Sequence, residues 1–574
     1  MFLTLFLGVA LLGSIASAAP SSRSISGSDP TAHVRNGTYA GVRNTHYGQD
    51  FFLGIPYAQQ PVGNLRFALP ASLNETWEGR RDAKAYGDIC VGYGTDSIWN
   101  PMSEACLTLN VIRDSSVEQG SNLPVGVWIH GGGFVMGSGA DERYNMSAIV
   151  ANAHRIGKPF IAVTLNYRLS TWGFLSSNQT ASAGITNIGL RDQRLALHWI
   201  QENIAAFGGD PSKVTIWGES AGGISVGTHL RAYGGRDDGL FRGAIMQSGG
   251  SVTIGASNAT EDQRFYNEIV SKTGCSHAGD TLQCLRTVPF EELNALFNGT
   301  GGDPAYDFST PVVDGDLIKD RGSVQLDKHA FVKVPIIAGS NTDEGTSFGP
   351  AGINTTRQWY EYLTNGTSGI KPPPSLATQI LNLYPDDPTQ GIPAFLGPVR
   401  IPSKGLQWRR TSAYAGDFSM HANRRRQCEA WAESKTPAYC YRFNTRGNDV
   451  EYLDGVAHFT EVAFVFNNIT GLGYHYGKPF ANLTEGERGR YLGLSKAVAS
   501  MWAGSIYDLD PNVDFDLDHG GAGAGEVIWE GYEVGKPVDL VFDANVTGFV
   551  ALEEDTWRKV GIEFINKNAG AFGR

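Results

Sequence analysis

The sequence of 574 residues contains few charged side chains, and the acidic ones predominate. Asp, Glu, Lys and Arg make up 18% of the chain, hydrophobic residues make up 41%, and the net charge is −12. These shares exclude a disordered polyelectrolyte and indicate a globular protein with a large core. The acidic balance argues against a nucleic-acid partner, because phosphate binding requires clustered Lys and Arg. We interpret the one basic run, Arg424-Arg-Arg426, as the solvated face of a helix.

Motifs that hold metal ions or nucleotide phosphates are missing. The chain has no C-x-x-C, no H-E-x-x-H and no G-x-x-x-x-G-K-[ST], and these spacings are typical of zinc and phosphate sites. We therefore expect no metal and no cofactor. Beyond the first nineteen residues no apolar stretch is long enough to cross a bilayer, so we expect no stable membrane insertion.

The one long apolar run stands at the start of the chain, MFLTLFLGVALLGSIASAA. It ends in Ala16-Ser-Ala18, which predicts a signal peptide over residues 1–18 that is cleaved after Ala18. The run lacks the Lys or Arg that usually precedes such a segment, and an uncleaved anchor is the alternative.

Two further features are typical of a secreted glycoprotein. Six cysteines permit three pairs in an oxidising compartment, and joining neighbours in sequence is the simplest of fifteen connectivities. That choice predicts the disulfides Cys90–Cys106, Cys275–Cys284 and Cys428–Cys440. Eleven N-x-S/T sequons are candidate glycosylation sites, at Asn36, Asn74, Asn145, Asn178, Asn258, Asn298, Asn354, Asn365, Asn468, Asn482 and Asn545.

The chain has no internal repeat and no Pro- or Gly-rich linker, so we expect a single domain over residues 19–574. From about residue 125, short apolar runs such as VGVWIH, FIAVTLNY and VTIW alternate with helical patterns. This alternation predicts an α/β fold with a large, mostly parallel sheet and helices on both faces.

Three serines lie in the pattern G-x-S-x-G, namely Ser220, Ser225 and Ser347. In a parallel sheet, ligands bind beyond the carboxyl ends of the strands. Ser220 directly follows the apolar run 214–217, and its flanking glycines permit a sharp strand-to-helix turn that exposes a nucleophile. Ser225 is expected inside the following helix, and Ser347 lies too far beyond the nearest apolar run. Ser220 is therefore the candidate nucleophile.

A serine nucleophile also needs donors for the oxyanion that develops on its substrate. The segment His130-Gly-Gly-Gly-Phe134 follows a predicted strand, and small residues there let main-chain N–H groups approach a ligand. A plain glycine turn is the alternative for this segment alone. Paired with the elbow, it predicts an oxyanion hole formed by the N–H groups of Gly132, Gly133 and Ala221.

Several motifs in order make the chain resemble a type-B carboxylesterase, the family that also contains cholinesterases and large fungal lipases. They are Gly54-Ile-Pro-Tyr-Ala58, Pro61-Val-Gly-Asn-Leu-Arg-Phe67, Met102-Ser-Glu-Ala-Cys-Leu107, the glycine loop, Asn203-Ile-Ala-Ala-Phe-Gly-Gly-Asp-Pro211, Gly218-Glu-Ser-Ala-Gly-Gly223 and Gln247-Ser-Gly249. The resemblance implies an α/β-hydrolase fold and the hydrolysis of carboxylic esters. Ala105 departs from the family, which usually has Asp at this position.

The resemblance also implies the partners of the nucleophile. Matching the D-E-G motif makes Glu344 the acid, with Asp343 as the alternative, and the segment 455–459 makes His458 the base. His130 is the rival histidine, but in the family's fold its position supports the glycine loop. Glu219 and Ser248 match positions that surround the catalytic residues.

The loop between Cys90 and Cys106 bears on the substrate, since in related lipases the corresponding loop carries an apolar lid. In this chain it is short and not continuously apolar, which favours an esterase for small-molecule esters that are soluble or have modest acyl groups. An interfacial lipase or sterol esterase is the alternative. A cholinesterase with Trp99 as its cation site and a noncatalytic adhesion protein are less favoured, and the oligomeric state stays open.

Overall fold

The structure of the protein is a computed structural model. It describes residues 29–97, 100–253, 258, 260–299, 305–306, 308, 310–365, 372–513 and 527–574. The predicted signal peptide at 1–18 and Trp99 lie outside these residues, so they stay predictions.

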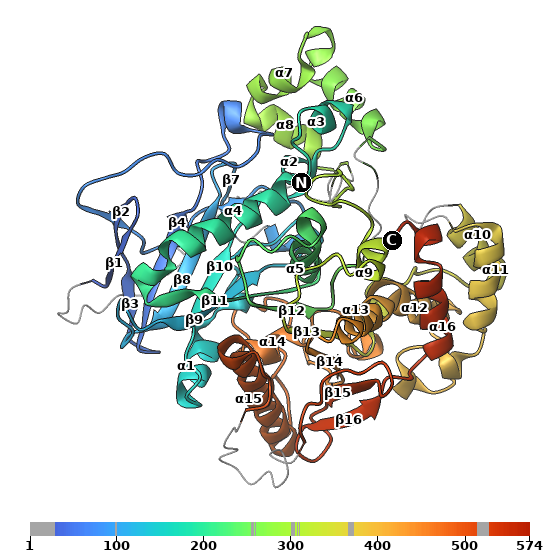
Figure 1. The fold of residues 1–574 in the computed structure, drawn as a ribbon. Coiled ribbons are helices and arrows are strands. Elements are labelled where there is room, and N and C mark those ends of the chain that lie inside the picture. The colour runs from blue at the N-terminus through green and yellow to red at the C-terminus, as the bar shows by residue number, and fades with distance from the viewer. Residues whose placement is uncertain are drawn as a thin grey trace, which may run out of the picture.

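An eleven-stranded sheet forms the centre of the molecule (Figure 1). Its spatial order is β16-β15-β14-β13-β12-β11-β9-β10-β8-β4-β3. The strands are β3 Val42–Asn44, β4 Gln49–Pro56, β8 Thr108–Asp114, β9 Leu123–Ile129, β10 Ile161–Leu165, β11 Gly209–Glu219, β12 Gly243–Gln247, β13 Ile336–Asn341, β14 Ala438–Phe443, β15 Val538–Phe542 and β16 Val550–Glu554. From β10 to β15 neighbouring strands run parallel, and antiparallel pairs form both edges. The predicted, mostly parallel sheet is confirmed.

Two small sheets lie apart from the central one. The first contains β1 Thr31–Val34, β2 Gly37–Ala40 and β5 Arg80–Asp82, and the second pairs β6 Ile89–Cys90 with β7 Met102–Ser103.

Helices connect the strands. They are α1 Ser147–Arg155, α2 Ser170–Phe174, α3 Asn178–Ser182, α4 Ile188–Asn203, α5 Ala221–Arg231, α6 Gln263–Lys272, α7 Thr281–Thr287, α8 Phe290–Phe297, α9 Gly322–Asp327, α10 Thr356–Thr364, α11 Pro374–Leu383, α12 Trp408–Gly416, α13 Ala422–Glu433, α14 Val462–Val465, α15 Glu485–Asp508 and α16 Lys559–Lys567.

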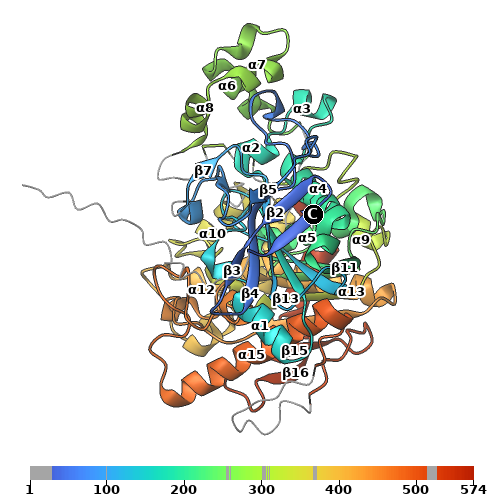
Figure 2. The ribbon, with the colours of Figure 1, turned by 90° about the vertical axis from the view of Figure 1, so that its left-hand side faces the viewer.

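The central sheet buries apolar side chains on both faces, as alternation along a strand requires. On β9, Val127 packs into a core with residues of α4 and α5, whereas its neighbour Trp128 packs into a second core with residues of α1 and α15. The two helix layers accordingly lie on opposite sides of the sheet (Figures 1 and 2). Two smaller cores hold α6, α7 and α8 in one region and α10, α11, α12 and α16 in another.

The cysteines are joined in the three pairs that the sequence predicts. Each bridge closes a short local loop, with sequence separations of 16, 9 and 12 residues. The bridges therefore fix the geometry of individual loops rather than joining distant parts of the chain.

The prediction that Arg424-Arg-Arg426 forms a solvated helix face was wrong. Arg424 and Arg425 on α13 are only 5% and 3% exposed. Both guanidinium groups bond to the carboxylate of Asp555, and Arg424 also pairs with Asp539 on β15. Charged side chains are buried in this way only when they are paired, and of these partners Asp539 lies on β15 and Asp555 directly follows β16.

Most sequons are accessible, but Asn468 is an exception. Its residue is 7% exposed, its amide nitrogen donates to the Leu472 carbonyl at 2.9 Å, and its amide oxygen accepts from the Leu472 N–H at 2.9 Å. A glycan on this nitrogen would have to break the turn, so the structure argues against the prediction at Asn468. Asn36 and Asn145 are half-buried, and the other eight sequon asparagines are exposed.

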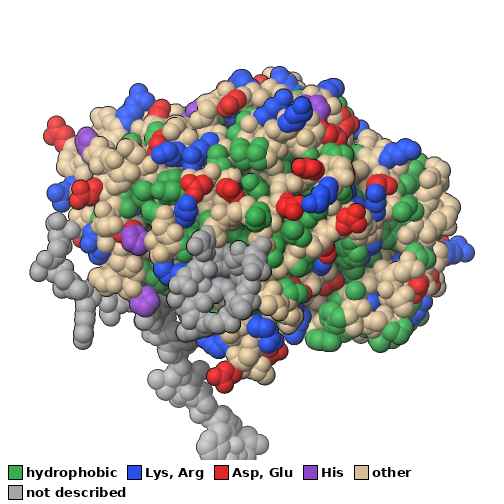
Figure 3. Space-filling model, turned by 60° about the horizontal axis from the view of Figure 1, so that its bottom comes forward, with side chains coloured by type: hydrophobic (Ala, Val, Ile, Leu, Met, Phe, Trp, Pro, Cys, Tyr) green, Lys and Arg blue, Asp and Glu red, His purple; other side chains and the backbone are tan. Residues whose placement is uncertain are grey.

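The surface carries charges of both signs. On the face seen in Figure 3, basic and acidic side chains lie interspersed with hydrophobic ones. Within the described ranges, none of the helices has the length and apolar character that a membrane span requires.

Candidate active site

Ser220 stands at a sharp turn between β11 and α5. Its backbone has φ 56° and ψ −123°, a strained conformation for a residue with a side chain, and its N–H donates to the Gln247 carbonyl at 2.9 Å. The turn depends on small neighbours, because a Cβ at Gly222 would lie 2.0 Å from the Ile129 carbonyl oxygen. Ser220 is partly exposed, so the turn presents its hydroxyl at the carboxyl end of the sheet.

The other two serines of the repeated pattern lie in different surroundings. Ser225 is buried within α5, where its hydroxyl donates to the Ala221 carbonyl at 2.8 Å and accepts from Gln193 at 3.0 Å. Ser347 is exposed on the loop after β13. Only Ser220 among the three follows directly on a strand of the central sheet.

The glycine loop after β9 lies against the serine turn. A Cβ at Gly131 would stand 2.7 Å from the Glu219 carbonyl oxygen and 3.1 Å from the Cβ of Ser220. Gly132 and Gly133 adopt φ values of 97° and 63°, which favour glycine. Within the described chain, the N–H groups of Gly132, Gly133 and Ala221 make no hydrogen bond. They are therefore free to donate to a ligand.

His130 supports this loop from beneath. The residue is 1% exposed, its ring stacks on Tyr167 with centroids 4.4 Å apart, and its Nδ1 lies 2.9 Å from the Gly131 carbonyl oxygen. Burial lowers its pKa to about 4. The contacts of this buried imidazole are with Tyr167 and with Gly131 of the loop, which fits a supporting role.

Glu344 and His458 meet across the ends of β13 and β14. Oε2 of Glu344 lies 2.6 Å from Nδ1 of His458. The carboxylate is fully buried, and its Oε1 accepts hydrogen bonds from the Asn341 N–H at 2.8 Å and from the Ser248 hydroxyl. These bonds fix the carboxylate, which in turn fixes the orientation of the imidazole.

Asp343 makes no contact with the His458 imidazole among the described hydrogen bonds. It instead holds the loop that carries His458. Its Oδ2 accepts the Val456 N–H at 2.9 Å, and a Cβ at Gly455 would lie 2.3 Å from the same oxygen. Burial raises the pKa of Asp343 to about 6. Of the two candidate acids, Glu344 is the one that contacts His458.

The other side of the imidazole faces the residue that precedes Ser220. Nε2 of His458 lies 3.1 Å from Oε1 of Glu219, whose residue is 1% exposed. Burial alone lowers the pKa of His458, but the charges of Glu219, Glu344 and Glu461 and the hydrogen bond to Glu344 raise it to about 9. Burial in turn raises the pKa of Glu219 well above its usual range.

Sequence reasoning did not single out Glu461 and Phe348. Glu461 is buried behind the imidazole, where its Oε2 accepts from the Asn341 amide at 2.6 Å. The Phe348 ring meets the His458 ring edge-on with centroids 4.9 Å apart, and Phe348 is 40% exposed. The signals that could have indicated them are the spacing of three residues from His458 to Glu461 and the apolar residue just beyond Glu344.

The loop between Cys90 and Cys106 is anchored on both sides. The Tyr93 N–H donates to the Val135 carbonyl at 2.7 Å, and the Tyr93 hydroxyl bonds to Asn294 at 3.0 Å. Asp96 pairs with Arg143 at 2.6 Å. In the described part of this loop, these contacts tie the chain to the glycine loop and to α8.

Comparison with protein families matches residues 28–537 to the carboxylesterase family. The chain belongs to that family. Carboxylesterase-family proteins hydrolyse carboxylic esters, and this activity is the one that the match supports for the chain.

Fungal lipases are among the similar carboxylesterase-family sequences. Lipase 5 of Diutina rugosa is 36% identical over 451 residues, which cover 73% of this chain and 79% of the relative. A secreted triacylglycerol lipase of Gibberella zeae is 31% identical over 573 residues, or 94% of this chain and 90% of the relative.

Solved structures similar to this chain confirm the α/β-hydrolase fold. EstA of Aspergillus niger has a TM-score of 0.79 and 27% identity, covering 95% of this chain and 99% of its own. A structure described as PNB esterase has a TM-score of 0.71 and 26% identity, covering 93% of this chain and 100% of its own.

Proposed function

We propose that the protein is a secreted serine ester hydrolase that forms an acyl-enzyme on Ser220. The observation that carries this proposal is the position of the His458 imidazole. It is bound to Glu344 through Nδ1 at 2.6 Å, and its Nε2 faces Glu219, the neighbour of Ser220. The base therefore stands beside the strained turn that exposes the hydroxyl.

In the proposed reaction, His458 accepts the proton of Ser220 as the hydroxyl attacks the ester carbonyl. Glu344 stabilises the imidazolium that forms. The imidazolium then gives its proton to the leaving alcohol. A water molecule, deprotonated by the same imidazole, releases the carboxylic acid from Ser220.

The free N–H groups of Gly132, Gly133 and Ala221 are proposed to bind the oxyanion of each tetrahedral intermediate. Donors that already point at the site stabilise developing charge without having to reorganise. The close approach of Gly131 to Ser220 supports this role. It brings the glycine loop beside the place where the ester carbonyl carbon would be attacked.

The anchored loop between Cys90 and Cys106 favours soluble esters as substrates. A lid that opens at a lipid surface must detach from the body of the protein, and the bonds of Tyr93 and the Asp96–Arg143 ion pair oppose such a movement. Lipase activity is the second candidate, because similar proteins from Diutina rugosa and Gibberella zeae are named lipases.

Secretion is part of the proposal. Similar proteins of Gibberella zeae and Botryotinia fuckeliana are described as secreted, and three disulfides are typical of an oxidising compartment. The sequence of residues 1–18 provides the predicted signal peptide.

Labelling with a fluorophosphonate, followed by peptide mass spectrometry, tests the nucleophile. We expect the folded protein to carry the label on Ser220. The S347A variant should be labelled to the same extent, and S220A should not be labelled. A folded protein that takes up no label would support the noncatalytic adhesion alternative instead.

Rates on nitrophenyl esters of increasing acyl length, with and without an emulsion, test the substrate class. A soluble-ester hydrolase should reach its full rate without an interface. A steep rise in rate when the emulsion forms would favour the lipase candidate.

A further inference from the structure

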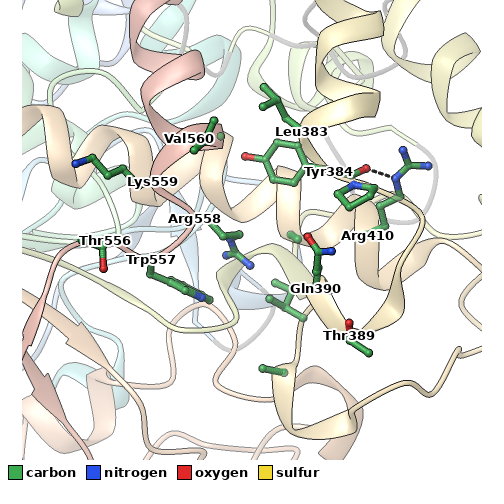
Figure 4. Close-up of a pocket in the computed structure, with 16 residues that line it drawn as sticks. Leu383, Tyr384, Thr389, Gln390, Arg410, Thr556, Trp557, Arg558, Lys559 and Val560 are labelled. Carbon is green, nitrogen blue, oxygen red and sulfur yellow. Dashed lines mark hydrogen bonds between the residues drawn. The ribbon is translucent and has the colours of Figure 1, made fainter.

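A pocket of about 480 Å³ opens between α11, α12 and the start of α16 (Figure 4). The segment of residues 389–394 closes its remaining side. Its size falls in the range of sites that hold small organic molecules. None of Ser220, Glu344 and His458 lines it, so it is distinct from the candidate active site.

The walls of the pocket are mostly apolar, and the charged residues among them are all basic. Leu383, Ile392, Ala413 and Val560 supply aliphatic surface. Arg410, Arg558 and Lys559 are the charged lining residues, and none of the described lining residues is acidic. In a chain with a net charge of −12, this lining points to an anionic ligand with an apolar portion.

The three basic side chains differ in what they offer a ligand. Arg410 is occupied, because its guanidinium donates to the Leu381 carbonyl at 2.6 Å, to the Tyr384 carbonyl and to two side chains. Lys559 extends away from the middle of the group of labelled residues, whereas Arg558 extends toward Gln390 (Figure 4). Arg558 is therefore the residue placed to meet a ligand.

Arg558 has one bonded edge and one unbonded nitrogen. Its Nε donates to Oδ1 of Asp417 at 2.9 Å, and its guanidinium lies over the Trp557 ring at 3.8 Å from the centroid. Nη2 is buried and has no hydrogen-bond partner among the described residues. The side chain as a whole keeps 14% of its surface exposed and lines the pocket, so a ligand there meets the exposed part of this side chain rather than Nη2.

We propose that this pocket binds a carboxylate that carries an aliphatic chain, such as a medium-chain fatty acid. The carboxylate pairs with the guanidinium of Arg558, and the chain packs against the aliphatic walls. Asp417 already offsets part of the arginine's charge. A monoanion therefore suits the site better than a phosphate dianion, which would need more donors. The site does not depend on the proposed chemistry at Ser220.

Binding of radiolabelled octanoate to the full-length protein, measured by equilibrium dialysis, tests the proposal. Ser220 is first blocked with an alkyl fluorophosphonate, so that the acyl site is filled. If the phosphonate does not react, which would count against the proposed function alone, the same measurement uses S220A. We expect one saturable site for octanoate and, at the same concentration, no displacement by octan-1-ol.

Two variants and a matched control locate the site. R558Q should weaken octanoate binding about tenfold or more, since it removes a charge-assisted hydrogen bond. A394W should also prevent binding, because Ala394 is exposed where it lines the pocket and a bulky side chain there fills it without entering a core. K567Q removes a charge from the exposed far end of α16 and should bind octanoate normally.

The binding measurements on the two variants and on octan-1-ol each support or overturn the proposal. If R558Q does not fold, A394W still decides the question, because its substitution lies at the surface. The proposal is overturned if octanoate shows no saturable binding. It is also overturned if A394W binds as tightly as the native protein, or if octan-1-ol competes as well as octanoate does.

Discussion

Replacing Glu219 by Gln is expected to move the acidic limb of the kcat/KM profile to lower pH. In the proposed mechanism, His458 accepts a proton from Ser220 only when the imidazole is neutral, so the rate should rise with pH as His458 deprotonates. Burial alone lowers this pKa, but the charge of Glu219 is foremost among the influences that raise it to about 9. Gln keeps the size of the side chain and removes the charge, so neutral imidazole is present at lower pH.

The size of the shift follows from the contact between the two side chains. Oε1 of Glu219 and Nε2 of His458 are 3.1 Å apart. At that separation two unit charges interact by about 1.3 kcal/mol in bulk water, and more strongly in a buried site. This corresponds to about 1 pKa unit as a lower bound. The net rise from 6.5 to about 9 sets the scale but is no ceiling, because burial lowers the pKa while Glu344 and Glu461 share with Glu219 in raising it. We expect a shift of about 1–2 units.

The assay is kcat/KM on a soluble nitrophenyl ester, measured from about pH 5 to 10 so that it spans the histidine pKa. E202Q is the matched control, since Glu202 is an exposed glutamate on α4 and its loss changes the net charge equally. Its profile should coincide with that of the native protein. If the E219Q limb also coincides with the native one, or moves to higher pH, the account of the His458 pKa is refuted.

Three further substitutions test the site and the core. S220A should lower kcat by on the order of a thousandfold or more while S347A leaves it unchanged, as ester hydrolysis assays of the two folded variants would show. G131A should reduce kcat by about tenfold or more without unfolding the protein, because its Cβ displaces Glu219 and Ser220. D555A should lower the free energy of unfolding by about 3–5 kcal/mol in urea titration, because it leaves buried Arg425 without a carboxylate partner and Arg424 with Asp539 alone.

A contrary result is defined for each of the three substitutions. Retained activity in S220A would remove the assignment of the nucleophile, and full activity in G131A would show that the loop tolerates displacement. D327A is the control for D555A: Asp327 contacts Arg426 at the surface, so its loss should change stability by less than about 0.5 kcal/mol. Equal effects of the two Asp variants would contradict the stabilising role of the buried cluster.

The parts of the site that could be predicted from sequence are those tied to local geometry. A strand followed by a serine between glycines dictates a turn, and the turn around Ser220 is present because Gly222 must pass within contact of Ile129. The glycine loop follows β9 for a similar local reason. Parallel order then places the ends of β11, β13 and β14 at one edge of the sheet, where His458 and Glu344 meet.

What sequence could not reveal depends on partners far away along the chain. The run Arg424-Arg-Arg426 has the pattern of a solvated face, and its burial becomes clear only with Asp539 and Asp555 in place. Asn468 lies in a formally valid sequon, but the turn to Leu472 takes up its amide. The electrostatics of His458 likewise depend on Glu219 and Glu461, which are brought together only by the fold.

Asp539 and Asp555 leave the ribosome 115 and 131 residues after Arg424, the cation that they neutralise. Until then, α13 has two arginines and no counterion for them, and β14 remains an unprotected edge. Maturation of the nascent chain must therefore wait for its last strands. A cell that produces this protein has to keep a nearly complete polypeptide from aggregating during that interval, which makes chaperone capacity a determinant of its yield.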